Sequence, residues 1–274
     1  MKFAVLGPLS LTDPGGSLLP TPPKTRQLLA LLVLHANSLV TLDTCVRELW
    51  GDSSPRSAVQ SVHTRVFQIR QALSGDLTGP TTTESKRILE THHQGYSLHI
   101  EKGNLDLDVL DAHMARSRLA HSRTDDLKIS TELRSALGLW RGRTLVNIQQ
   151  GPCIQARVAG LEDLRMTTLE QCIEAELRLG MHHRLLSELR TLVSQYPVHE
   201  NLHAQYMVAL YRSGRTAEAL GTYQRLHRTL TRELGIEPSQ RMRQLQTAVL
   251  TESEVLDVTS PHRAVLSVDL MASP

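Results

Sequence analysis

The sequence has few of the residues that mark several large classes of protein. Aromatic residues make up only 3% of the chain, so its cores must be filled mainly by leucine, valine, isoleucine and alanine, which favours helices packed on helices. The three cysteines, Cys45, Cys153 and Cys172, are odd in number and far apart, which argues against a disulfide framework or a zinc knuckle. The longest apolar run, Leu28 to Leu34, is far shorter than the roughly 20 residues that span a bilayer. We therefore expect a cytoplasmic protein without a membrane span.

A large excess of charge of one sign is also missing. The chain has 30 Lys and Arg against 28 Asp and Glu, a formal net charge of +2. The first 100 residues hold nine basic and seven acidic side chains, and the remainder holds equal numbers of each. Any binding to an anionic polymer is therefore expected in the N-terminal hundred residues. With 274 residues and 40% apolar composition, two domains with real cores are the leading expectation.

The N-terminal third predicts a short strand pair followed by three helices. Apolar alternation favours strands within residues 2–11, and the leucine-rich stretch 24–36 favours a largely buried helix. A second helix is expected over 41–49, with Thr41 or Asp43 as a plausible cap, and a third over 56–73.

The third of these helices carries the functional signal. Its expected buried stripe has spacings of three and four and consists of Val59, Val62, Val66, Ile69 and Leu73. The opposite side carries Gln60, Ser61, Thr64, Arg65 and Gln68, with Arg70 at its flank. No carboxylate occurs from Arg56 to Leu73. Amides, hydroxyls and guanidinium groups without acids are the donors and acceptors that bind base edges and phosphates.

A hairpin follows these helices. After a linker at Gly79–Thr83, residues 87–91 and 96–100 alternate as strands around a turn that contains His92 and Gly95. Three helices followed by a hairpin is the order of a winged helix-turn-helix, in which the second and third helices form the DNA-binding pair.

The second half predicts only helices. They are expected at residues 106–119, 125–140, 154–179, 183–195, 199–212, 215–234 and 238–251. Pairs such as Gly180 with Gly214 and Ala175 with Ala209 are 34 residues apart, the period of tetratricopeptide units. Residues 252–274 lack a sustained pattern and are expected to form a mobile tail, in which residues 264–270 could form a short strand.

Several stretches in order resemble one known family. They are residues 3–9, 26–32, 48–51, 95–98, 209–215, 218–220 and 233–239. The chain resembles the streptomycete antibiotic regulatory proteins over about residues 1–250. The resemblance implies an OmpR-like winged helix and a bacterial transcriptional activation domain of the tetratricopeptide type. It also implies an activator, without catalysis or cofactor, that binds direct repeats of double-stranded promoter DNA, often as paired protomers, and recruits RNA polymerase through its sigma factor.

The resemblance also implies roles for individual residues. The DNA contacts are expected at Gln60, Ser61, Thr64, Arg65, Gln68, Arg70, Lys86, Arg87, His92 and Tyr96. Trp50, Gly51, Asp52 and Ser53 match the loop that touches polymerase in winged-helix activators. The family often has Ser-Arg-Leu-Arg where this chain has Phe67-Gln68-Ile69-Arg70, which replaces a guanidinium suited to guanine with an amide better suited to adenine. His92 stands at the wing tip, where an arginine is frequent.

Two other functions compete with this interpretation. His199, Glu200 and His203 form an HExxH sequence, the signature of zinc peptidases, but no third ligand follows at the required spacing. We interpret this segment as part of the packing face of a repeat and expect no metal. The winged helix could also serve as a protein-binding module on an interaction scaffold.

The sequence thus predicts a mainly α protein. Residues 1–102 are expected to form a winged-helix DNA-binding domain of α/β type, 103–251 an all-α activation domain and 252–274 a tail.

Overall fold

The computed structural model describes residues 1–75 and 81–257. Parts of two predicted segments, the linker at 79–83 and the tail from 252, extend beyond these residues, and the strand expected at 264–270 lies outside them. The chain divides into two units. One consists of residues 1–115 and 135–166, and the other of residues 116–134 and those from 167 onward.

The first unit begins with a small antiparallel sheet. Its strands are β1 (Lys2–Ala4), β2 (Ser10–Asp13) and β3 (Gly16–Ser17), in the order β1-β2-β3. Phe3 faces Leu11 across β1 and β2. The predicted strand pair is confirmed, and the turn after Asp13 adds β3 as a third strand because the Asp13 carboxylate accepts a hydrogen bond from the Gly15 amide at 2.8 Å.

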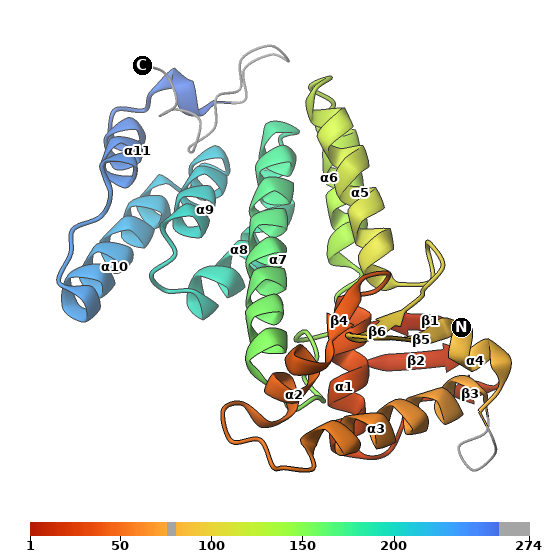
Figure 1. Ribbon diagram of the computed structural model, residues 1–274. Coiled ribbons are helices and arrows are strands. Elements are labelled where there is room, and N and C mark those ends of the chain that lie inside the picture. The colour runs from red at the N-terminus through yellow and green to blue at the C-terminus, as the bar shows by residue number, and fades with distance from the viewer. Residues whose placement is uncertain (76–80, 258–274) are drawn as a thin grey trace. The chain divides into compact units, whose positions relative to one another are not determined.

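Three helices follow, as predicted. They are α1 (Pro23–Leu34), α2 (Leu42–Trp50) and α3 (Ala58–Leu73), and α1 packs against both of the others (Figure 1). Every residue of α1 from Leu28 to Leu34 is buried, which explains why its leucines form no narrow stripe. The hydroxyl of Thr41 accepts a hydrogen bond from the Thr44 amide, so of the two predicted caps of α2 it is Thr41, and Asp43 lies in the first turn.

The wing differs from its prediction in two elements. A short helix, α4 (Thr83–Ile88), precedes β5 (Leu89–His92) and β6 (Gly95–Leu98), so the strand expected from residue 87 begins at Leu89. A further strand that the sequence did not predict, β4 (Leu39–Thr41), pairs with β6 in a sheet of order β4-β6-β5. Gly95 is required here, because a Cβ atom at this position would lie 2.0 Å from the Val40 carbonyl oxygen.

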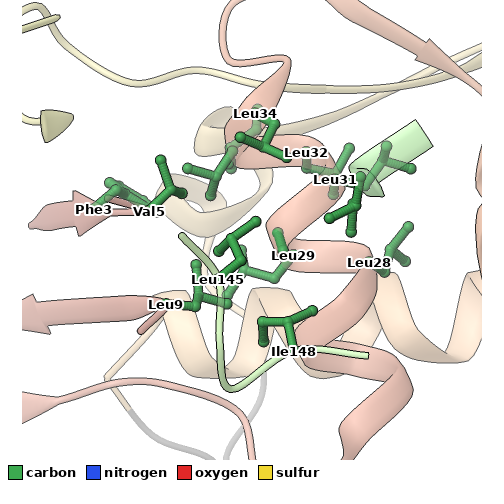
Figure 2. Close-up of a cluster of buried hydrophobic side chains, with 14 of the residues drawn as sticks. Phe3, Val5, Leu9, Leu28, Leu29, Leu31, Leu32, Leu34, Leu145 and Ile148 are labelled. Carbon is green, nitrogen blue, oxygen red and sulfur yellow. The ribbon is translucent and has the colours of Figure 1, made fainter. Parts of the chain in front are cut away.

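Residues well beyond the wing complete the core of this unit. Figure 2 shows Leu145 and Ile148 in the same cluster as Phe3, Val5 and leucines of α1. The Leu145 amide donates to the Gly7 carbonyl at 2.7 Å. One carboxylate oxygen of Asp106 accepts from the amides of Val5 and Leu6, at 2.8 Å each. The N-terminal sheet is therefore held by residues on the C-terminal side of the predicted boundary.

The remaining helices match the sequence prediction to within a few residues. They are α5 (Asp106–His121), α6 (Asp126–Leu137), α7 (Pro152–Arg178), α8 (His182–Gln195), α9 (Glu200–Arg212), α10 (Thr216–Leu234) and α11 (Gln240–Leu250), followed by a 3₁₀ turn (Glu254–Leu256). Within the second unit, α9 packs against both α8 and α10, and each residue from Leu202 to Leu210 is buried. This is the arrangement of stacked helical hairpins.

The HExxH residues are engaged separately in the second unit. His199 lies 2.9 Å from the Glu170 carboxylate, Glu200 accepts a hydrogen bond from the Ser239 amide at 3.0 Å, and His203 is buried. Across the described residues, no three His, Cys, Asp or Glu side chains come together as a metal site would need. The segment acts in packing and in pairing between elements of this unit.

Candidate nucleic-acid interface

The free face of α3 is the centre of the candidate site. Gln60 and Thr64 lie exposed on it, as the sequence predicts for residues that contact DNA. The helix carries no acidic side chain from Ala58 to Leu73. Its buried face consists of Ala58, Val62, Val66, Ile69, Ala72 and Leu73, which anchor it to the core of the unit.

The exposed face also holds three residues that the sequence analysis did not select. Val59 is 44% exposed and Phe67 is 49% exposed, and His63 lies exposed between them at a spacing of four. The assignment of Val59 to the buried stripe was wrong. Ala58 takes its place, because the stripe that passes through Val62 and Val66 reaches residue 58 one turn earlier. Continuing the four-residue spacing through positions 59, 63 and 67 could have found this face.

Arg65 lies at the flank of α3 rather than on its free face. Its guanidinium carbon is 5.6 Å from the ring centroid of Trp50, and the Lys24 ammonium is 4.4 Å from the same centroid. Neither cation has an acidic partner among the described residues. Burial first, and the charge of Arg65 second, lower the pKa of Lys24. Two close cations without a counter-charge favour an anion beside Trp50.

Several predicted contact residues instead hold the site together. Arg70 donates from two nitrogens to the Leu89 carbonyl, at 3.0 and 2.7 Å, and from one of them to the Thr91 hydroxyl at 2.8 Å. It therefore fixes β5 of the wing to α3. The amide oxygen of Gln68 accepts from the Thr25 hydroxyl at 2.5 Å, which joins α3 to α1.

The other predicted residues divide by exposure. Lys86 and Arg87 are exposed in the last turn of α4, a short helix in contact with α3. His92 is exposed on the wing and lies 2.7 Å from the Ser97 hydroxyl. Tyr96 is only 5% exposed, and burial raises the pKa of its hydroxyl. Tyr96 thus supports the wing from inside and offers little surface to a ligand.

The chain leaves α2 at Gly51, whose φ of 60° turns it into the following loop. Asp52 and Ser53 are exposed there, whereas Trp50 is partly covered by the two cations. This loop offers a small polar surface next to the α3 flank. Whether its four predicted residues touch polymerase stays a prediction.

Comparison with known proteins agrees with this geometry. The family model described as "Transcriptional regulatory protein, C terminal" matches residues 16–98, and the one described as "Bacterial transcriptional activator domain" matches residues 105–250. The regulatory protein DnrI of Streptomyces peucetius is 38% identical over 262 residues, which are 96% of each chain. The regulatory protein AfsR of Streptomyces griseus is 31% identical over 93% of this chain but only 25% of its own length.

A solved structure has the same fold. Mycobacterium tuberculosis EmbR, in complex with a low affinity phosphopeptide, superimposes with a TM-score of 0.84 at 29% identity. The match covers 92% of this chain and 65% of the EmbR chain, so the chain spans just under two thirds of that relative.

A winged helix followed by a helical activator domain defines the class of protein, a DNA-binding transcriptional regulator. The chain belongs to the streptomycete antibiotic regulatory protein family of transcriptional activators, which are not enzymes. None of the helices in residues 1–75 and 81–257 has both the length and the hydropathy needed to cross a bilayer.

Proposed function

We propose that this chain binds double-stranded promoter DNA by placing α3 in the major groove. The observation that carries the proposal is the exposed, acid-free face of α3, which the core and the wing hold from behind. Of the polar side chains on this face, Gln60 and Thr64 make the hydrogen bonds to base edges. Glutamine pairs with adenine through two hydrogen bonds, which favours A·T pairs beneath Gln60.

The cations around α3 bind the phosphate backbone. Lys24 and Arg65 hold one phosphate beside Trp50, and Lys86 and Arg87 hold another from the last turn of α4. His92 contacts the phosphate backbone of the DNA from the wing. Ser61, Gln68, Arg70 and Tyr96 contribute by fixing the positions of these groups, since each is partly or fully buried.

The loop that follows α2 contacts the sigma factor of RNA polymerase holoenzyme through its exposed residues Asp52 and Ser53. Trp50 and Gly51, at the end of α2, set the direction of this loop. The protein acts in the cytoplasm on direct repeats near promoters of an antibiotic or other secondary-metabolite gene cluster. Two protomers bind adjacent repeats cooperatively, because four phosphate-binding cations in one protomer limit its affinity. Residues 1–102 serve as the DNA-binding domain, with residues 103–115 and 135–166 completing its core, 103–251 supply the activation domain, and 252–274 form a tail.

Electrophoretic mobility of promoter fragments from the chain's own gene cluster tests the DNA-binding step. We expect retardation at low salt, and at physiological salt we expect specific retardation to be lost with Arg65→Ala and retained with Arg232→Ala, whose side chain is 79% exposed in the second unit. If no fragment is retarded, the activator function is refuted and the interaction scaffold takes its place. In a transcription assay, Asp52→Ala should reduce transcript yield without changing DNA affinity, and unchanged yield would remove the loop from the polymerase contact.

A further inference from the structure

Two large apolar side chains lie on the free face of α3, where solvent exposure is unfavourable for them. Phe67 is 49% exposed and Val59 is 44% exposed, and no other large hydrophobic residue of α3 is exposed. Both belong to a helix whose opposite face is buried in the core through Val62, Val66 and Ile69. Their exposure therefore cannot be assigned to a frayed or poorly packed end of the helix.

Neither arginine of α3 offers a free guanidinium to this face, although Arg70 begins on the same side of the helix as Phe67. The guanidinium of Arg65 donates to the Ser61 carbonyl at 2.7 Å and lies beside Trp50, and Arg70 is bound to the Leu89 carbonyl. Bidentate reading of guanine by arginine, the commonest specific contact in the major groove, therefore has no side chain to perform it on the exposed face. What remains there is apolar surface with an amide, a hydroxyl and an imidazole.

The charge around this face selects its partner. The helix has no carboxylate, and the exposed cations Arg56, Lys86 and Arg87 lie just before α3 and in the neighbouring α4. An apolar strip bordered by cations fits a polyanion that presents apolar groups in a groove. In DNA, the only such group at a major-groove edge is the 5-methyl of thymine.

We propose that Phe67, together with Val59, reads thymine in the major groove by burying its 5-methyl group. This inference rests on the proposed binding of α3 to DNA and adds the base that the apolar strip selects. The two side chains are eight residues apart, which corresponds to roughly 12 Å along a helix. At about 3.4 Å per base pair, they meet thymines separated by roughly three steps rather than neighbours.

The test begins with a duplex chosen by the protein itself. The full chain selects from a library of random double-stranded DNA, and the tightest duplex is then synthesised with each thymine replaced singly by deoxyuracil. This replacement removes one methyl group and leaves every hydrogen-bonding atom in place. We expect a loss of about fourfold in affinity at each contacted position, the value of one buried methyl group.

Variants at position 67 assign the effect. At the thymine that Phe67 contacts, Phe67→Ser should bind the thymine and deoxyuracil duplexes with equal affinity. Phe67→Leu should keep the preference for thymine there. Val146→Ser is the matched control, because Val146 is 59% exposed in the same unit but lies outside α3, and it should keep the fourfold preference. Since Phe67→Leu retains an apolar side chain, it tests the proposal even if Phe67→Ser folds poorly.

Three results would overturn the inference. Equal affinity of the wild-type chain for every deoxyuracil duplex would show that no methyl group is read. An unchanged preference in Phe67→Ser would assign the effect to DNA shape instead of to this side chain. Enrichment of no duplex at all would refute the proposed function and this inference together, and is therefore distinct from the first two results.

Discussion

Trp50 has an unusual pair of neighbours at the scale of single residues. The Lys24 ammonium and the Arg65 guanidinium both lie within 6 Å of its ring centroid, and Lys24 also donates to the Leu49 carbonyl at 3.2 Å. Each cation–π contact at such a site contributes about 0.5–1 kcal/mol. The ring thus holds two like charges close together, although they repel each other, and a bound phosphate would offset that repulsion.

Replacing Lys24 should therefore weaken DNA binding in a manner independent of sequence. In Lys24→Gln, the dissociation constant should rise equally for specific and random duplexes, and the slope of log affinity against log salt should decrease in magnitude by about 0.9. Fluorescence anisotropy at four salt concentrations measures the slope. Arg232→Gln is the control and should leave it unchanged. A wild-type slope in Lys24→Gln would remove this side chain from the phosphate contacts.

His203 makes the stability of the second unit dependent on pH. Burial first, and the charge of Arg225 second, lower the pKa of this histidine to about 4, whereas an unfolded histidine titrates near 6.5. Between these values the unfolded chain binds a proton that the folded chain does not, so stability falls as pH decreases from about 6.5 toward 4. The hydrogen bond to Glu170 raises the pKa of His199, so the contribution of His199 to stability changes with pH in the opposite direction.

The difference between wild type and His203→Leu isolates the first effect. On lowering the pH from 7 to 4.5, the free energy of unfolding of the wild type should fall by about 2 kcal/mol more than that of the variant. Urea unfolding followed by circular dichroism at the two pH values measures this difference. Parallel losses in both proteins would mean that His203 titrates normally in the folded state.

Among the elements, α2 and α7 are joined by one buried carboxylate. Glu48 is 1% exposed, and its oxygens accept from the amides of Gly151, Cys153 and Ile154 at 2.7, 2.9 and 3.1 Å. These amides are at the start of α7, where the first N–H groups of a helix have no partner within the helix. The first helix of the DNA-binding pair, α2, thus caps a helix more than 100 residues away in sequence.

Glu48→Gln should destabilise the protein by about 2–3 kcal/mol, because an amide group cannot accept with both of its terminal atoms and leaves a buried donor unpaired. Urea unfolding at neutral pH measures the loss. Glu237→Gln changes a carboxylate that is 63% exposed and should alter stability by less than about 0.5 kcal/mol. A similarly small change in Glu48→Gln would show that water replaces the missing interaction.

How far the elements could be predicted depends on the length of their patterns. The long helices from α5 to α11 repeat an apolar stripe over three or more turns, so their limits were predicted to within a few residues. The strand β4 has only three residues and is defined by pairing with β6, which lies far away in sequence. The side chain of Thr82 caps α4 through the Ser85 amide, a local signal that a strand pattern hides.

The candidate site was predicted less completely than the fold. Periodicity selected α3 as the candidate recognition helix but misplaced Val59, because one apolar residue at the first turn fits two neighbouring faces. Nothing in the sequence pairs Lys24 with Trp50, since 26 positions separate them and they belong to different helices. Arg70 looks like a contact residue by its type, yet its partner is the Leu89 carbonyl, which only the folded wing supplies.

At the scale of the whole molecule, the DNA-binding unit is larger than a winged helix. The family models end the first domain at residue 98 and begin the second at 105, and the predicted boundary is at 102. The unit defined by contacts also includes residues up to 115 and the segment 135–166. Leu145 is fully buried in the same core as Phe3 and the leucines of α1, and the side chain of Asn147 accepts a hydrogen bond from the Leu9 amide at 2.7 Å.

A fragment that ends at residue 102 should therefore lack much of its own core. The amides of Val5 and Leu6 would lose their hydrogen bonds to the Asp106 carboxylate. The apolar surface that Leu145 and Ile148 cover would become exposed to solvent. We expect this fragment to unfold without a cooperative transition, whereas a fragment of residues 1–166 unfolds cooperatively and binds DNA with the affinity of one protomer. Thermal unfolding followed by circular dichroism compares the two fragments with the full chain. A cooperative transition in 1–102 at the temperature of 1–166 would contradict this expectation and would make the segment 135–166 a dispensable support.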